Sequence, residues 1–173
     1  MPITLAIIGA GPHGRQLALR AARAGCSVLL EDVMPSNLHH AQEFIRQELN
    51  AETLPAVAFV STIEDAVRNA DLIIDCVPDE LESKLEILWL LDRMAPPHSV
   101  FATPTIRHSI ADLASCTYRP DKVVAIAAEP SAFGQAIGLN IELRTSPATS
   151  PETIALVTEF WRQLGFEPSV SDQ

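Results

Sequence analysis

Three glycines near the amino terminus have the spacing of a phosphate-binding loop. Gly9, Gly11 and Gly14 fit the pattern GxGxxG. The apolar run before them predicts a buried strand and the residues after them predict a helix, which is the setting that dinucleotide binding by this pattern requires. Gly9 permits the tight turn, and Gly11 leaves the backbone open to a pyrophosphate. Gly14 lets the helix pack closely on the strand.

The helix predicted after the glycines provides partial positive charge for a phosphate. Its first N–H groups have no intrahelical acceptor, and the helix dipole is positive at that end. Pro12 suits the first helical position because it has no N–H to leave unpaired. His13 either reaches a phosphate or ribose or lies on the surface without a ligand. For the loop as a whole, the alternative is a glycine-rich turn that binds nothing.

An acidic residue follows at the distance expected for ribose recognition. Asp32 ends the second predicted strand, roughly 20 residues after the glycine loop. Its carboxylate can accept hydrogen bonds from ribose hydroxyls and would repel a 2′-phosphate, and Glu31 adds to that repulsion. No Arg or Lys stands at positions 33–35 to pair with such a phosphate. The sequence therefore predicts NAD(H) rather than NADP(H) as cofactor.

Predicted strands and helices alternate along the rest of the chain, with short connections. Apolar runs place strands at 3–8, 27–31, 56–60, 72–77, 99–103, 122–127, 140–144 and 167–170. Helical patterns lie at 12–24, 38–49, 64–69, 80–95, 109–115 and 151–164, and Ser36 is the expected cap of the second helix. The loop 129–138 has no clear pattern. This alternation predicts an α/β fold, with a Rossmann-type doubly wound, mostly parallel sheet in one domain, 1–173.

Charge and composition exclude several kinds of partner. The 173 residues include 22 acidic and 12 basic side chains, and the net charge of −10 works against nucleic acid and anionic membranes. No apolar run is long enough to span a bilayer, and no basic region precedes the first strand as in a signal peptide. The isolated Cys26, Cys76 and Cys116 predict buried free thiols rather than disulfides or a metal site. We therefore expect a cytoplasmic protein that binds no metal.

With these residues placed, the chain resembles the NAD-binding domain of the 3-hydroxyacyl-CoA dehydrogenases over nearly its whole length. The segments that carry the resemblance are the glycine loop, the strand ending at Asp32, and residues 66–84, 91–92, 100–103, 141–147 and 164–165. The resemblance implies cofactor contacts at Val77, Pro78, Asp79 and Lys84. An acid and a lysine after the fourth strand would face the crevice where α/β sheets bind ligands. The alternative is a weak, solvated surface pair.

The residues that perform catalysis in this family are altered. The family's catalytic histidine begins a His-Phe-Phe-Asn-Pro stretch, but the matching segment here begins with Ile126, which cannot accept a proton. The glutamate that orients this histidine is matched by Glu142. His108 is a candidate replacement base, and the alternative is that it only caps or decorates a short helix.

The family's Ser-Asn-Thr-Ser-Ser stretch, whose polar groups meet the substrate and the nicotinamide, is matched by residues 103–107. Thr103 and Thr105 keep hydroxyl groups there, whereas two polar positions are altered. The resemblance therefore implies that Thr103 lies beside the cofactor.

We expect the helical domain that completes the acyl-CoA pocket and the dimer in this family to be missing here. One hypothesis is an NAD-dependent oxidoreductase acting on a small hydroxy or oxo compound or an acyl-CoA, with a homodimer or a partner subunit to complete it. The other is a catalytically silent NAD(H)-binding module or sensor. A relative of the β-hydroxyacid or 6-phosphogluconate dehydrogenases is a third reading, which residues 71–84 fit less well.

Overall fold

The computed structural model describes residues 2–135 and 138–172, which form an eight-stranded sheet with the order β3-β2-β1-β4-β5-β6-β7-β8. The strands are β1 (Thr4–Ile8), β2 (Ser27–Glu31), β3 (Val57–Val60), β4 (Leu72–Asp75), β5 (Val100–Pro104), β6 (Val123–Ile126), β7 (Asn140–Thr145) and β8 (Glu167–Asp172). Neighbouring strands are parallel except β6 and β7, which are antiparallel. The mostly parallel Rossmann-type sheet predicted from the sequence is confirmed.

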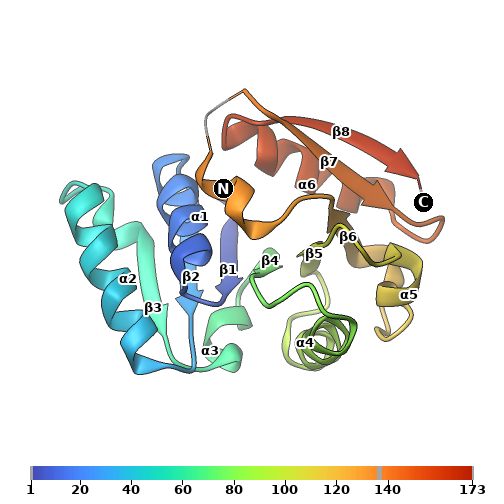
Figure 1. Ribbon diagram of the computed structural model, residues 1–173, viewed down its shortest axis with the longest axis horizontal. Coiled ribbons are helices and arrows are strands. Elements are labelled where there is room, and N and C mark those ends of the chain that lie inside the picture. The colour runs from blue at the N-terminus through green and yellow to red at the C-terminus, as the bar shows by residue number, and fades with distance from the viewer. Residues whose placement is uncertain (1, 136–137, 173) are drawn as a thin grey trace.

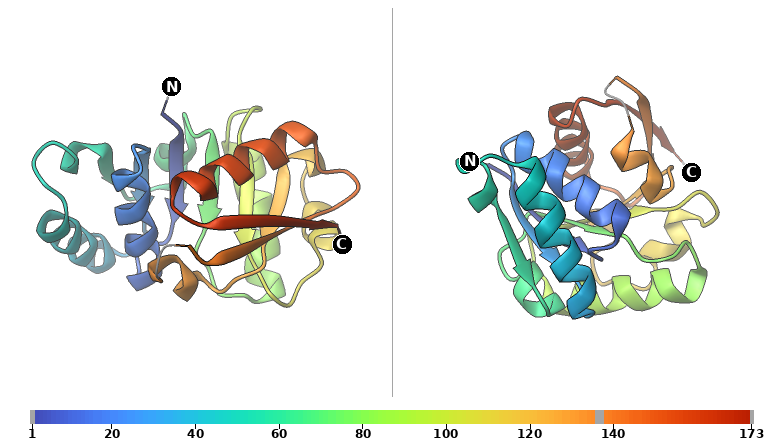
Figure 2. Two further views of the ribbon diagram at one scale, coloured as in Figure 1. Left: turned by 90° about the horizontal axis from the view of Figure 1, so that it is seen from above. Right: turned by 60° about the vertical axis from the view of Figure 1, so that its left-hand side comes forward.

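Helices cover both faces of the sheet (Figures 1 and 2). The core on one face is formed with α1 (Pro12–Arg23), α2 (Pro35–Glu48) and α6 (Pro151–Gln163). The core on the other face is formed with α3 (Ile63–Val67), α4 (Leu81–Met94) and α5 (Ile110–Ala114). Burial on both faces explains why the central strands are continuous apolar runs.

The strand order reverses beside β1, and this reversal fixes the place of a ligand site. The chain passes from β1 to its neighbour β2 on one side and later returns to β4 on the other. The connections after β1 and β4 therefore diverge at the carboxyl edge of the sheet and leave a crevice between them. The glycine loop follows β1 directly, so it lies at this crevice.

Some local predictions need correction. Ser36 does not cap α2, because Met34 is the N-cap residue and Pro35 takes the first helical position. Cys26 is buried as expected, but Cys76 and Cys116 are only partly buried, and all three are free thiols. In the loop 129–138 the structure shows a short 3₁₀ helix, Pro130–Gly134, while positions 136–137 lie outside the described residues.

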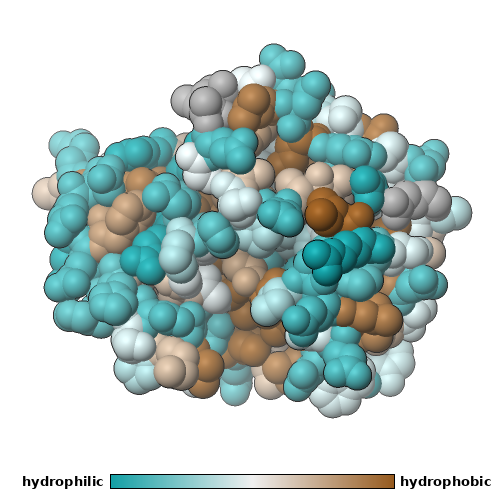
Figure 3. Space-filling view, viewed as in Figure 1, coloured by the Kyte–Doolittle hydropathy of each residue, from teal (hydrophilic) through white to brown (hydrophobic). Residues whose placement is uncertain are grey.

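The surface is uneven in character. In Figure 3 hydrophilic side chains dominate over α2, at the left, and hydrophobic ones gather between α3 and α4. None of the helices that the structure describes has the length and apolarity to cross a lipid bilayer.

Candidate cofactor site

The glycine loop has a backbone that other residues could not adopt without strain. Gly9 has a φ of +110°, in the region that favours glycine, and its N–H donates to the carbonyl of Glu31 at 2.8 Å. A Cβ on Gly14 would lie 1.8 Å from the Gly9 carbonyl oxygen, so only glycine fits there. A Cβ on Gly11 would have no atom within 4 Å. Gly11 therefore faces open space, as close approach of a ligand to the backbone requires.

The amino end of α1 is open to an anion. Its N-cap residue is Gly11, no side chain makes a cap hydrogen bond, and no acidic residue lies in the first turn. Pro12 occupies the first turn, as the sequence predicts. Unpaired N–H groups at the positive end of a helix of this length suit a phosphate group.

Asp32 is hydrogen-bonded to the glycine loop. Its Oδ2 accepts hydrogen bonds from Ala10 N at 2.9 Å and from Asn37 Nδ2 at 3.0 Å, and its Oδ1 accepts one from Met34 N at 2.8 Å. The carboxylate is largely buried at the end of β2. It thus couples the loop after β1 to the loop after β2, which the sequence alone did not indicate.

A cleft of about 450 Å³ lies beside the glycine loop, between connections that follow β1, β4, β5 and β6. We call this cavity the cleft. The structure brings together in its wall four of the predicted cofactor residues, His13, Val77, Pro78 and Asp79. The remaining lining residues are Cys76, Glu80, Arg107, Glu129, Pro130 and Ser131.

Asp79 joins the cleft to the loop after β5. Its Oδ2 accepts a hydrogen bond from Ile106 N at 3.1 Å. Burial alone would raise the pKa of Asp79, but hydrogen bonds from Thr105 and Ile106 and the charges of Lys84 and His108 lower it below its usual value. Asp79 is therefore a carboxylate at neutral pH.

His108 lies against Asp79. Its Nε2 is 3.6 Å from Asp79 Oδ1 and 3.3 Å from the Asp79 carbonyl oxygen, and both side chains are mostly buried. The backbone N–H of His108 donates to Thr105 Oγ1 at 3.2 Å, which holds the turn after β5. A carboxylate beside an imidazole is a common arrangement for orienting a proton acceptor. Sequence reasoning named both residues but not their contact.

Lys84 does not line the cleft. Its ammonium group is fully buried and lies 2.7 Å from Asp75 Oδ1, at the end of β4, whose side chain is 1% exposed. A cofactor contact by Lys84 stays a prediction, and it would require this pair to rearrange. The sequence did not identify Asp75, although an acid nine positions before a lysine across a strand–helix turn is the available signal.

The residues matched to the family's catalytic groups do not form a catalytic pair. Ile126 is fully buried within β6, in the core beneath α1 and α6. Glu142, on β7, accepts hydrogen bonds from Ser171 Oγ at 2.7 Å and from Arg144 Nε at 3.3 Å. These hydrogen bonds lower the pKa of Glu142. Its partners are therefore a serine and an arginine rather than a histidine.

Thr103 is held inside the sheet without a polar partner among the described residues. It is fully buried in β5, and its Oγ1 makes no hydrogen bond there. An orphaned buried hydroxyl is costly, so a bound group that reaches it would gain from pairing with it. This is consistent with the predicted position of Thr103 beside a cofactor.

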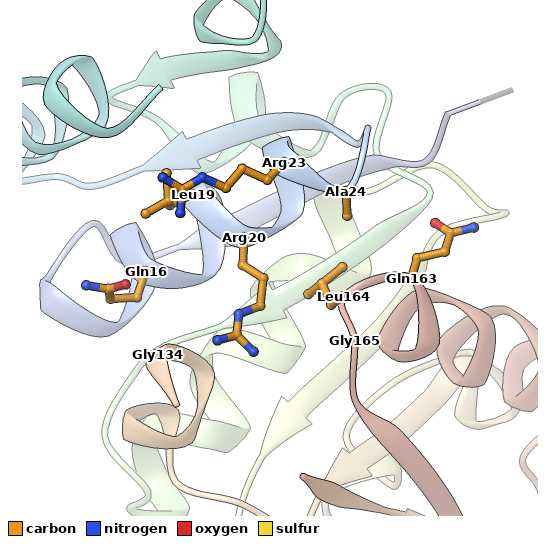
Figure 4. A pocket seen from close by; sticks show the side chains of 9 residues that line it. All are labelled: Gln16, Leu19, Arg20, Arg23, Ala24, Gly134, Gln163, Leu164 and Gly165. Carbon is orange, nitrogen blue, oxygen red and sulfur yellow. The ribbon is translucent and has the colours of Figure 1, made fainter. Parts of the chain in front are cut away.

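A separate cavity of about 380 Å³ lies between α1 and α6 (Figure 4). Its lining on α1 starts at Gln16 and ends at Ala24, so it lies along the later part of that helix and away from the glycine loop. Two arginines line it, but Arg20 is bonded to the Gln135 carbonyl and Arg23 to Glu48. The groups suited to a dinucleotide are therefore at the cleft and not here.

The residues at the cleft fit NAD on observations of this structure. Gly11 leaves space above the backbone, the amino end of α1 is uncapped, and the buried carboxylate of Asp32 lies next to both. A dinucleotide needs these three features for its pyrophosphate and its adenosine ribose.

Comparisons with known proteins indicate an NAD-binding domain. Residues 4–172 match the family described as 3-hydroxyacyl-CoA dehydrogenase, NAD binding domain. The 5-formyl-3-hydroxy-2-methylpyridine 4-carboxylate 5-dehydrogenase of Mesorhizobium japonicum is 29% identical, over 96% of this chain and 56% of its own length. A probable 3-hydroxybutyryl-CoA dehydrogenase of Bacillus subtilis is 27% identical, over 87% of this chain and 57% of its own.

Solved structures of related proteins have the same fold. The 3-hydroxyacyl-CoA dehydrogenase of Archaeoglobus fulgidus superimposes with a TM-score of 0.82 and 27% identity, over 98% of this chain and 56% of that one. The chain spans about half the length of the curated relatives it matches. It belongs to the family of 3-hydroxyacyl-CoA dehydrogenase NAD-binding domains.

Proposed function

We propose that this protein acts as an NAD(H)-dependent oxidoreductase on a small hydroxy or oxo compound, with the cleft as its reaction site. The observation that best supports this proposal is the glycine loop beside a cleft of about 450 Å³. The space over Gly11 is open, the amino end of α1 has no side-chain cap, and Asp32 is hydrogen-bonded to the loop. Bound NAD supplies the hydride acceptor, or NADH the donor, and the protein supplies binding and orientation.

The chain's own residues have distinct roles in this proposal. The glycine loop and the first turn of α1, with Pro12 and His13, bind the pyrophosphate, and Asp32 accepts the ribose hydroxyls. Val77, Pro78 and Asp79 form the wall behind the cofactor. The hydroxyl of Thr103, buried in β5, would pair with a cofactor group that reached it. His108, oriented by Asp79, accepts the proton that leaves a substrate hydroxyl. The family resemblance assigns Glu142 to the substrate side, as an orienting group.

The substrate and the partners belong to the same proposal. Relatives act on different substrates: one is named for a pyridine carboxylate that bears a formyl group and others for acyl-CoA thioesters. The continuous sheet supports treating residues 1–173 as one domain, and the free thiols support a reducing compartment such as the cytoplasm. We also propose a homodimer or a partner subunit, since Leu81, Trp89 and Met94 are large apolar side chains of α4 that stay exposed.

A titration tests the cofactor assignment. NADH fluorescence measured with increasing protein should show binding at least about tenfold tighter than that of NADPH, because Asp32 repels a 2′-phosphate. Asp32→Asn keeps the size and the acceptor oxygen but removes the charge, and should reduce this preference. Equal affinity for NADH and NADPH in the unsubstituted protein would contradict the role of Asp32.

A second candidate function is an NAD(H)-binding module without turnover, which the buried Ile126 favours. Oxidation of 3-hydroxybutyrate and of 3-hydroxybutyryl-CoA, followed by NADH absorbance, separates the two. The oxidoreductase proposal expects turnover that His108→Ala abolishes, while His40→Ala, a change at an exposed histidine of α2, leaves it intact. NADH binding with no turnover of either compound would favour the binding module, and unchanged turnover in His108→Ala would place the base elsewhere.

A further inference from the structure

Arg107 stands where two cavities meet. It lines the cleft, and it also lines a groove of about 520 Å³ between α4 and α5. We call this second cavity the α4–α5 groove. Its wall carries His108 and Ser109 on one side and the apolar Leu81 and Leu85 of α4 on the other. The remaining lining residues are Asp112 and Ser115.

The guanidinium of Arg107 is not paired with an acid of the described residues. Among residues 2–135 and 138–172 its guanidinium makes no ion pair, and its backbone N–H donates a hydrogen bond to Thr105 Oγ1 at 3.3 Å. Asp79, an acid of the cleft wall, is instead engaged by Ile106 N and lies against His108. An exposed guanidinium therefore remains available at the junction of the two cavities.

The surroundings of Arg107 favour a ligand with a single negative charge. Glu80 and Glu129 line the cleft and Asp112 lines the α4–α5 groove, so a polyanion such as the phosphates of coenzyme A would meet several carboxylates. The chain as a whole carries a net charge of −10, which adds to that repulsion. One guanidinium matches one carboxylate, which it can bind through two parallel hydrogen bonds.

The apolar side of the groove adds a second requirement. Leu81 and Leu85 are one helical turn apart on α4 and both line the groove, so they form a short apolar wall next to Arg107. A ligand that places a carboxylate at Arg107 can lay a hydrocarbon portion along this wall.

We propose that Arg107 binds the carboxylate of the substrate, and that the substrate is a short hydroxy or oxo acid in its free form rather than a coenzyme A thioester. This inference rests on the proposed function. It assigns a specificity-determining role to Arg107.

Ligand binding to the protein–NADH complex tests the inference without requiring turnover. NADH is titrated first, and acetoacetate, acetoacetyl-CoA or inorganic phosphate is then added and followed by calorimetry. Acetoacetate should bind, and Arg107→Gln should weaken it by about 10- to 100-fold, the loss expected for a charged hydrogen-bonded pair. Arg107→Lys should give an intermediate affinity, because it keeps the charge and loses the bidentate geometry.

A matched control is Arg46→Gln, a change at an exposed arginine of α2 that lines neither cavity, and it should leave acetoacetate binding unchanged. The inference is overturned if acetoacetyl-CoA binds more tightly than acetoacetate, or if phosphate binds as tightly, which would indicate a general anion site. It is also overturned if Arg107→Gln weakens NADH itself, because Arg107 would then be a cofactor ligand. Failure of the unsubstituted protein to bind NADH would instead count against the proposed function.

Discussion

At Gly14 the backbone leaves no room for a side chain, whereas at Gly11 there is open space that a ligand could fill. A methyl group on Gly14 would lie 1.8 Å from the Gly9 carbonyl oxygen, and one on Gly11 would touch nothing within 4 Å. We therefore expect Gly14→Ala to lower the free energy of unfolding by roughly 3 kcal/mol, and Gly11→Ala to change it by less than about 0.5 kcal/mol.

Gly11→Ala should still weaken NADH binding by at least about tenfold, because its methyl group enters the space that the pyrophosphate needs. Urea unfolding, monitored by the fluorescence of the buried Trp161, measures the first effect, and NADH titration measures the second. A Gly11→Ala protein that binds NADH normally would show that the cofactor does not approach this loop.

The pair of Lys84 and Asp75 separates a structural role from a role in binding. Removing one partner of a buried ion pair leaves an uncompensated charge, so Lys84→Met should cost about 3–5 kcal/mol in urea unfolding. Adding Asp75→Leu removes the second charge and should recover most of that loss. If Lys84 is purely structural, the double variant binds NADH like the unsubstituted protein. A folded double variant that has lost NADH binding would give Lys84 the cofactor role predicted from the sequence.

Residue types and spacing were enough to predict the turn of the glycine loop and the place of Asp32 after β2, because local backbone geometry fixes both, and the family resemblance pointed to Asp79. They were not enough for Lys84. The side chain of a lysine after a strand–helix turn can face the ligand or point into the core. Here it points inward because it pairs with Asp75, the last residue of β4. The contact of His108 with Asp79 was also out of reach, since it joins two loops that meet only at the sheet edge.

At the scale of elements, Arg119 holds the carboxyl end of α4. Its guanidinium donates to the Asp92 side chain at 2.7 Å and to the carbonyls of Asp92, Ala95 and Pro96. The Asp92 carbonyl has no N–H donor left within the helix, because residue 96 is a proline, and Ala95 and Pro96 follow the end of α4, so the arginine takes the place of a cap.

Arg119→Met should therefore destabilise the protein by about 2–4 kcal/mol, because it leaves the buried Asp92 carboxylate without its cation. Arg93→Met is the matched control on the same helix. The Arg93 side chain is exposed and lies over the rings of Trp89 and Tyr118, a contact that contributes about 1 kcal/mol or less. Equal losses in urea unfolding for the two variants would show that Arg119 is not acting as a cap.

Hydrophobic period and helix stop signals predicted these elements to within a few residues, from β1 through β8. They worked because each strand is buried on both faces and each long helix has one apolar stripe. The predicted start of α2 was wrong, because Pro35 at the first helical position outweighs the capping preference of Ser36. The short 3₁₀ helices, such as Pro130–Gly134, have no periodic pattern in the sequence. The contact of Arg119 with α4 also has no sequence signal, because it joins distant segments.

At the scale of the whole molecule, a pair of buried acids makes stability depend on pH. Glu31 and Asp32 are adjacent acids at the end of β2 and both are buried. Asp32 has three hydrogen-bond donors, whereas Glu31 lines a small cavity with apolar residues and with Glu64. Burial, and then the charge of Asp32, raise the pKa of Glu31 from its ordinary 4.5 to about 7. Folding therefore favours the protonated form of Glu31.

Because folding raises the pKa of Glu31, its ionisation destabilises the folded protein. Between pH 4.5 and about 7 the folded protein holds a proton on Glu31 that the unfolded chain has released, so Glu31 lowers the free energy of unfolding as the pH rises through this range. Glu31→Gln cannot ionise and should be free of this effect. We expect the two proteins to be similarly stable at about pH 4.5, and Glu31→Gln to be more stable by about 1–3 kcal/mol at about pH 8. Urea unfolding of both proteins across this range measures the difference, in which the titration of the other carboxylates cancels. A difference that stays constant with pH would mean that Glu31 has the same pKa in the folded and the unfolded protein, and that its burial does not raise this pKa.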